Sequence, residues 1–465
     1  MKRDVKNYYL LGFYLIVFLA FGLIGYLMPL LGDDYSWAGN FGQRYFQQGI
    51  FLYYDGRYLG DLLVILITRF PVIAFFAYGI CAVIIIAIIS KLTCSFQIHK
   101  NKGTNLFNYL FVASIVAVML LVLPSKIFRQ IWGWHAGFAN YAPSVIFPLL
   151  FVLMVVQASF QPQFNWANTW MRKITLLLVA LGSQFFAEHL TLLNCINEVF
   201  VFIFFRKLLS SRFLQYDLKW LSIGSFLGAG LMFINRAYLK IIFGMDNYRH
   251  INGQGLTLIP WFKLMIRQPK LGLMVLILIT IVGGLIFANL SRQRNHILTL
   301  TTFLLLFDAI VAILPFIVIS PFGPRCFFAS YLMLMTLFLI NLAPWLNFKF
   351  NVLSIFSLAL FVFLGVHFDI MSDHYGEDFK MSLRYTEYQN QLNRADFYIL
   401  NFKNVKYIWT NNLSTCKPYR EFFVKRPNVK IITVDYHDWD LYREDLHRMH
   451  YREFDQKIVN LIHKK

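Results

Sequence analysis

Long apolar runs alternate with short polar segments along most of the chain. A helix needs about 20 predominantly apolar residues to cross the hydrocarbon core of a bilayer. Runs near this length predict eleven transmembrane helices, at residues 8–31, 72–90, 106–123, 143–157, 174–187, 190–205, 218–235, 271–288, 297–319, 327–343 and 352–368. The two runs around Glu188 are short and would form broken or tilted helices.

The pattern changes after Phe368, where the last long apolar run ends. The remainder is polar and mixes helical and strand-like periodicities. Helices are predicted at 381–396 and 440–462, and strands at 407–410 and 429–434. The predicted fold class is therefore an all-α polytopic membrane protein with a small α/β C-terminal domain, divided into a membrane domain, 1–368, and a C-terminal domain, 369–465.

Composition excludes two broad classes of protein. Of 465 residues, 58% are hydrophobic and only 14% are charged, whereas a soluble globular chain has about 25% charged residues. A compact soluble enzyme and a disordered chain are both excluded. The five cysteines are scattered and match no zinc spacing, and we expect no structural disulfide.

The net charge of +19 lies almost entirely in the membrane domain, which has 27 basic and 10 acidic residues. Its basic residues occupy short loops between apolar runs, where they orient a membrane protein rather than bind nucleic acid. The basic start of the chain predicts an uncleaved first helix with a cytoplasmic N-terminus. An odd number of spans then places the C-terminal domain outside a multi-pass cell-membrane protein.

Four of the ten acids in the membrane domain are close together, in the first predicted outer loop, 32–70: Asp33, Asp34, Asp55 and Asp61. The adjacent pair Asp33 and Asp34 would repel each other at the edge of a low-dielectric region. This raises the proton affinity of at least one of them, which suits a general base. The alternative is that one of the two only caps the following helix.

The same loop holds Arg57 and several aromatic residues: Trp37, Tyr45, Tyr53, Tyr54 and Tyr58. Aromatic rings stack on sugar faces, and arginine binds phosphate through two parallel hydrogen bonds. The combination predicts a site for a sugar or sugar phosphate. The alternative for the aromatic residues is the interfacial belt of membrane proteins. The end of the loop, 61–69, is amphipathic and is expected to lie at the membrane surface.

Other polar residues fall at the predicted outer ends of spans: Arg129, Trp134, His135, Asn140, Glu188, His189 and Arg325. Positive charge on the outer side runs against the orientation rule, so these arginines are candidates for phosphate binding. Contact with lipid headgroups is the alternative. Glu198 and Asp308 lie within spans and are interpreted as polar contacts between helices.

Four motifs carry a resemblance to a known family: Asp33-Asp34-Tyr35, Gly56-Arg57-Tyr58, the segment Trp134-His135-Ala136-Gly137-Phe138-Ala139-Asn140-Tyr141, and Pro324-Arg325. The chain resembles the GT-C superfamily of integral-membrane glycosyltransferases, in particular bacterial families related to the O-antigen glucosyltransferases. Here a histidine follows the tryptophan of the third motif. The resemblance implies inverting transfer from a polyprenyl-phosphate-linked sugar, with an acid of the first outer loop as the base.

The function predicted from the sequence is sugar transfer to a cell-envelope glycan on the outer face of the membrane. Asp33 or Asp34 would be the base, and the predicted substrate-binding residues are Asp55, Arg57, Tyr58, Arg129, Trp134, His135, Asn140, Glu188, His189 and Arg325. Clustered carboxylates beside phosphate also suit Mg²⁺ or Mn²⁺, although nothing in the sequence requires a metal.

Two other functions remain open. A transporter or flippase of lipid-linked sugars would need charged residues deep in several spans and an internal repeat, and we detect no repeat. A membrane-anchored binding or assembly protein would work through its C-terminal domain and would not need the acids of the first loop.

Overall fold

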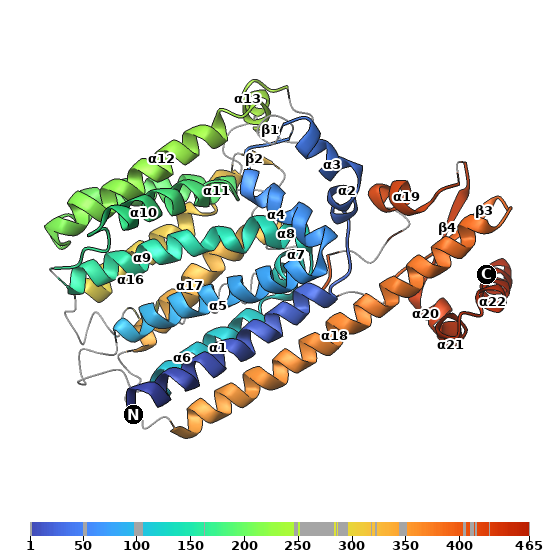
Figure 1. Ribbon diagram of the computed structural model, residues 1–465, viewed down its shortest axis with the longest axis horizontal. Helices are drawn as coiled ribbons and strands as arrows, with labels where there is room; N and C mark the ends of the chain where they lie inside the picture. Colours follow the sequence, from blue (N-terminus) through green and yellow to red (C-terminus); the bar gives the residue numbers. More distant parts are fainter. Residues whose placement is uncertain are drawn as a thin grey trace.

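The computed structural model describes residues 2–49, 54–96, 106–161, 163–245, 250–251, 283–284, 286, 296–317, 319–320, 323–343, 351–402, 406–409, 413, 416–426 and 428–464. Most helices lie side by side in one bundle, and the C-terminal part projects from one end of it (Figure 1). The N-terminus lies at the opposite end of the bundle.

Among the described residues, six helices are long and apolar enough to cross a membrane. They are α1 (Lys2–Leu27), α5 (Pro71–Ser95), α8 (His135–Tyr141) continuing into α9 (Ile146–Phe160), α16 (His296–Val311), α17 (Phe328–Leu342) and α18 (Asn351–Gln391). The number rises to eight if each of two bent pairs forms one span. These pairs are α6 (Leu106–Leu121) with α7 (Ser125–Ile131), bent by 89°, and α12 (Lys219–Phe233) with α13 (Arg236–Ile242), bent by 71°.

The predicted number of eleven spans is not shown. The two short runs around Glu188 are helices, α10 (Trp170–Ser183) and α11 (Glu188–Phe204), but they have only 14 and 17 residues. The predicted span 271–288 lies outside the described residues, apart from 283, 284 and 286. The structure thus describes a helical membrane protein with six to eight candidate spans.

Close contact between α1 and α5 depends on glycine. A side chain at Gly22 would meet the Phe75 ring at 2.9 Å, and one at Gly79 would meet the Phe18 ring at 2.5 Å. Small residues of this kind let two helix backbones approach closely within a membrane. The aromatic rings that fill the space beside them include Tyr78, which stacks on Phe138 with ring centroids 3.6 Å apart.

The first predicted outer loop folds into three helices at one end of the bundle: α2 (Asp34–Ala38), α3 (Asn40–Gln47) and α4 (Tyr58–Arg69) (Figure 1). The expectation that 61–69 lies at the membrane surface stays a prediction. Helix α4 packs against α8, and its Asp61, Val64 and Ile65 are buried. These buried side chains face protein rather than lipid headgroups.

The last long helix crosses the predicted domain boundary without a break. Helix α18 has 41 residues, which at about 1.5 Å per residue is about 60 Å, roughly twice the thickness of a bilayer's hydrocarbon core. Its apolar first half packs beside α1 and α6, and its polar second half carries the C-terminal unit (Figure 1). The change of polarity after Phe368 therefore marks a change of surroundings along one helix.

The C-terminal unit contains two parallel strands, β3 (Asp396–Leu400) and β4 (Lys430–Val434), with Asp396 opposite Lys430. Four short helices follow or separate them: α19 (Lys417–Phe423), α20 (Tyr436–Trp439), α21 (Arg443–His447) and α22 (Tyr451–Lys464). The predicted strand 429–434 corresponds to β4, whereas Tyr407 to Trp409 form bends. The predicted helix 440–462 is divided near Met449, which has a φ of 58°.

Candidate functional site

One cavity of about 290 Å³ brings together residues from distant parts of the sequence. It lies among α2, α4, α8, α11 and α13, at the end of the bundle near the C-terminal unit (Figure 1). Its charged and polar lining residues are Asp33, Arg57, Asp61, Asn140, Glu188, His189 and Arg325. Aromatic and aliphatic side chains complete the walls: Trp37, Tyr54, Trp134, Ala136, Tyr141, Leu192, Phe233, Tyr238, Ile241, Ile242, Pro315 and Phe316.

The two adjacent aspartates have different surroundings. Asp34 is buried, and its carboxylate accepts hydrogen bonds from the backbone N–H groups of Leu31 at 3.0 Å and Ala136 at 2.9 Å. It therefore ties the first loop to the start of α8. Burial raises its pKa to about 8, although these two hydrogen bonds oppose the shift. Asp34 does not line the cavity, and its geometry is that of a structural residue.

Asp33, in contrast, is exposed to the cavity. It occupies the N-cap position of α2, but its side chain makes no capping hydrogen bond. Desolvation raises the pKa of its carboxyl group, and the positive charge of Arg325 opposes this rise. A carboxylate that faces a cavity and has an elevated pKa is suited to accept a proton.

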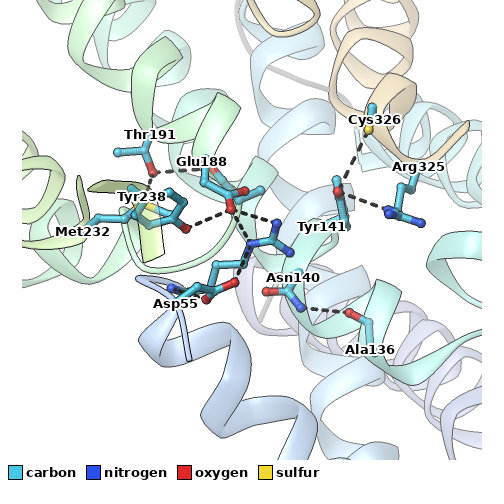
Figure 2. Close-up of polar contacts among 12 residues, drawn as sticks. Asp55, Ala136, Asn140, Tyr141, Glu188, Thr191, Met232, Tyr238, Arg325 and Cys326 are labelled. Atoms are coloured by element: carbon cyan, nitrogen blue, oxygen red, sulfur yellow. Dashed lines mark hydrogen bonds and ion pairs between the residues drawn. The ribbon is translucent and has the colours of Figure 1, made fainter. Parts of the chain in front are cut away.

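Arg57 is held by acidic partners at the N-terminus of α4. Its guanidinium group donates two hydrogen bonds of 2.8 Å to Glu188, and its backbone N–H donates to Asp55 at 3.0 Å. The Tyr238 hydroxyl also donates to Glu188, at 2.8 Å (Figure 2). Burial alone would lower the pKa of Arg57, but Glu188 and Asp55 hold it well above its usual value. This group joins α4 to α11 and α13.

Arg325 has a different set of partners. Its backbone N–H donates to Gln130 at 3.0 Å. Its Nε donates to the Tyr141 hydroxyl at 3.2 Å, as Figure 2 shows. Its guanidinium carbon lies 5.4 Å from the centre of the Trp134 ring and 5.8 Å from that of Tyr141. Within the part of the chain that the structure describes, Arg325 forms no ion pair with a carboxylate. Because Arg325 lines the cavity, its charge faces this space without an ion-pair partner among the described carboxylates.

Two buried polar atoms of the lining also have no hydrogen-bond partner among the described residues. Asn140 donates from Nδ2 to the backbone of Ala136 at 3.0 Å, but its Oδ1 accepts no hydrogen bond. The Nε1 of Trp134 has no acceptor. A buried polar atom without a partner is costly. Both residues line the cavity, and a ligand with hydroxyl groups could satisfy these atoms after a small side-chain movement.

Seven of the predicted site residues line this cavity: Asp33, Arg57, Trp134, Asn140, Glu188, His189 and Arg325. The other five do not. Asp34 and Asp55 do not reach the cavity: Asp34 accepts a hydrogen bond from the backbone N–H of Ala136, and Asp55 accepts one from the backbone N–H of Arg57. Arg129 lies on α7 and also does not line the cavity.

Tyr58 and His135 contact other protein groups instead of the cavity. The Tyr58 ring packs on Phe185 with centroids 5.2 Å apart, and its hydroxyl accepts a hydrogen bond from Asn235 at 3.2 Å. His135 is buried between Tyr78, whose hydroxyl is 3.1 Å from Nδ1, and the carbonyl oxygen of Met28, 3.3 Å from Nε2. The histidine that follows Trp134 thus connects α8 to α5 and α1.

The sequence did not identify Tyr238 or Phe316 as site residues. Tyr238 reaches Glu188 only because α12 and α13 are bent by 71° at the end of the bundle. Phe316 packs on His189, with ring centroids 4.8 Å apart. Neither residue belongs to a local motif, so only the tertiary contact reveals them.

The positions of the acidic and histidine side chains show where a metal ion could bind. Among the described residues, one group of acidic and histidine side chains is close enough to share an ion: Asp445, His450 and Glu453 in the C-terminal unit. Asp445 already pairs with Lys457 at 2.6 Å. The cavity carboxylates are not part of such a group, and we assign no metal-binding role to them.

Fold and site define a helical membrane protein with a polar, aromatic-rich cavity at one end of its bundle. No family model matches the sequence, and no curated protein or solved structure matches it. Its function is therefore inferred from the chemistry of the cavity.

Proposed function

We propose that this protein is a membrane glycosyltransferase of the GT-C type, which moves a sugar from a polyprenyl-phosphate donor to a cell-envelope glycan. One observation carries the proposal. A single cavity contains Asp33, a carboxylate with an elevated pKa, and Arg325, a cation that no described carboxylate neutralises. A glycosyl transfer to a hydroxyl group needs both a base and a positive charge for the departing phosphate.

In the proposed reaction, Asp33 accepts the proton of an acceptor hydroxyl group. The hydroxyl oxygen attacks the anomeric carbon of the donor, and the bond between that carbon and the phosphate oxygen breaks. The bonding electrons leave with the lipid phosphate, whose negative charge is stabilised by Arg325. Attack from the face opposite the leaving group inverts the configuration at the anomeric carbon. Asp33 then releases its proton to solvent.

Other lining residues suit the remaining parts of such a substrate. Trp37 and Tyr54 offer aromatic surface for contact with a sugar, and Asn140 offers an acceptor without a described partner for a sugar hydroxyl. On another wall, Leu192 and Ile242 are apolar and partly exposed. These apolar side chains would contact the first carbons of the lipid tail.

The transporter alternative has less support. It needs charged residues along a path through the membrane. Glu198 on α11 and Asp308 on α16 are carboxylates within the helical bundle, but both are buried and neither lines the cavity. The cavity itself lies at one end of the bundle, as a transfer reaction at one membrane surface requires (Figure 1).

The experiment is a transfer assay in membrane vesicles with polyprenyl-phosphate sugars, combined with mass spectrometry of envelope glycans from cells with and without the gene. Asp33→Asn should reduce transfer by about 10²- to 10⁴-fold, because a positioned base is lost. Asp373→Asn makes the same change at an exposed position of α18 and should leave transfer unchanged. Full transfer by Asp33→Asn, or unchanged glycans without the gene, would contradict the proposal.

A further inference from the structure

A short segment of the C-terminal unit, residues 406–409, packs on the two loops that carry Asp33 and Trp134. The Trp409 ring stacks on the Trp134 ring, with centroids 4.2 Å apart and planes 16° apart. Trp134 also contacts Arg325, whose guanidinium carbon is 5.4 Å from the ring centre. Trp409 thus contacts Trp134, which in turn contacts Arg325, the cavity cation without a described ion-pair partner.

Two glycines make room for this segment, and each directly precedes a cavity residue. Gly32 precedes Asp33 and has a φ of +55°, and a side chain there would overlap the Trp409 ring. Gly133 precedes Trp134, and a side chain there would overlap the carbonyl oxygen of Tyr407. The left-handed backbone at Gly32 is one that residues with a side chain rarely adopt. The sequence of both loops therefore fits the presence of the C-terminal segment.

Further contacts hold the segment and its neighbours in place. The Tyr407 ring packs on Phe128 and Phe368, with centroids 5.5 and 5.2 Å apart. On the other side of the aspartate pair, Tyr35 packs edge-on against Tyr419 of α19, with centroids 5.3 Å apart. The C-terminal unit therefore contacts the chain both before and after Asp33 and Asp34.

We infer that Trp409 is a positioning residue of the cavity. It holds Trp134 against Arg325, and it packs against the turn at Gly32 from which Asp33 extends. Trp409 does not itself line the cavity, so it acts through these neighbours. The inference rests on the proposed function, because it assigns Arg325 to the phosphate of the donor. It also makes the C-terminal unit a component of the site.

The test measures binding of polyprenyl phosphate to the full-length protein in lipid nanodiscs. Arg325→Gln should abolish most of the affinity. Trp409→Ala should weaken binding about tenfold, because the stacked ring that orients the cation–π pair is lost. Trp409→Phe keeps an aromatic face and should restore most of the affinity. Trp170→Ala removes an exposed tryptophan of α10 and should bind like the wild type.

The outcomes separate the two proposals. If Arg325→Gln weakens binding but Trp409→Ala binds like the wild type, the role of Trp409 is wrong and the proposed function stands. If Arg325→Gln also binds like the wild type, the proposed function fails. Thermal unfolding of each variant identifies loss of folding. If Trp409→Ala does not fold, Trp409→Leu replaces it, because leucine keeps apolar bulk without a ring. Trp409→Leu should show the same tenfold loss of affinity. Wild-type affinity of Trp409→Leu would overturn the inference.

Discussion

Asp33 and Asp34 are neighbours in the chain but differ in their access to the cavity and in their hydrogen bonds. Asp34 is buried and bound to two backbone N–H groups, whereas Asp33 faces the cavity and the charge of Arg325. A buried, hydrogen-bonded carboxylate organises the fold, and an accessible one can exchange a proton with substrate. Their surroundings therefore separate a structural carboxylate, Asp34, from one that is available for the proposed proton transfer, Asp33.

The pKa of Asp33 predicts a pH dependence. Asp33 must be deprotonated to act as a base, and desolvation raises its pKa while Arg325 lowers it. Transfer should therefore fall as the pH falls through a value above the usual range of aspartate, about 3.9. In Arg325→Gln the opposing charge is absent, so the midpoint of residual activity should move to higher pH. Transfer rates measured as a function of pH for the wild type and for Arg325→Gln test this shift of the midpoint.

Arg448→Gln is the matched control, because Arg448 is an exposed residue of the C-terminal unit that pairs only with the nearby Glu444 among described residues. Its pH profile should equal that of the wild type. A midpoint that stays in place or moves to lower pH in Arg325→Gln would show that these two groups do not interact.

At the scale of elements, the packing of α4 against α8 forms one wall of the site. Arg57 is at the start of α4 and Asn140 is on α8. The two helices approach closely because Gly60 has no side chain, and a side chain there would overlap Asn140 Oδ1. The position of Asn140 thus depends on a glycine that is 80 residues away in the sequence.

Gly60→Ala should separate these two helices. We expect a loss of stability of about 1–3 kcal/mol, typical of overpacking, and a clear loss of transfer because Asn140 is displaced. Thermal unfolding in detergent and the transfer assay measure the two effects. Gly230→Ala is the control: Gly230 lies in α12 with nothing within 4 Å of an added side chain. It should keep full activity, and wild-type behaviour of Gly60→Ala would contradict the described packing.

At the scale of the whole molecule, the N-terminus and the C-terminal unit lie at opposite ends of the bundle (Figure 1). The cavity lies in the bundle, at the end from which the C-terminal unit projects. Helix α18 connects the two, because its 41 residues are more than a membrane span needs. The proposed transfer on the outer face requires this end to be outside the cell.

Cysteine labelling tests this orientation. Leu441→Cys places a thiol on an exposed position of the C-terminal unit, and Asn7→Cys places one near the start of α1. A membrane-impermeant maleimide should label Leu441→Cys in intact cells and Asn7→Cys only after permeabilisation. The unmodified protein, with its five native cysteines, gives the background. The reverse pattern would place the cavity at the cytoplasmic face and contradict transfer outside.

The sequence by itself determined the membrane character, the apolar helices and the loop that carries Asp33. These follow from local hydrophobicity and from the scarcity of acids, which are properties of neighbouring residues. The sequence predicts a domain boundary after Phe368. Helix α18 continues through this position, because a change from apolar to polar side chains does not interrupt the backbone hydrogen bonds of a helix.

Only the tertiary structure decided which of the two aspartates faces the cavity, because Asp34 is bound by the N–H of Ala136, which lies 102 residues further along the chain. It also decided that Arg57 is neutralised by Glu188 while Arg325 is not, and that Trp409 reaches Trp134. Charge compensation and ring stacking depend on distances between side chains from different elements. Such distances are set by how the helices and the C-terminal unit pack together, and no local pattern specifies them.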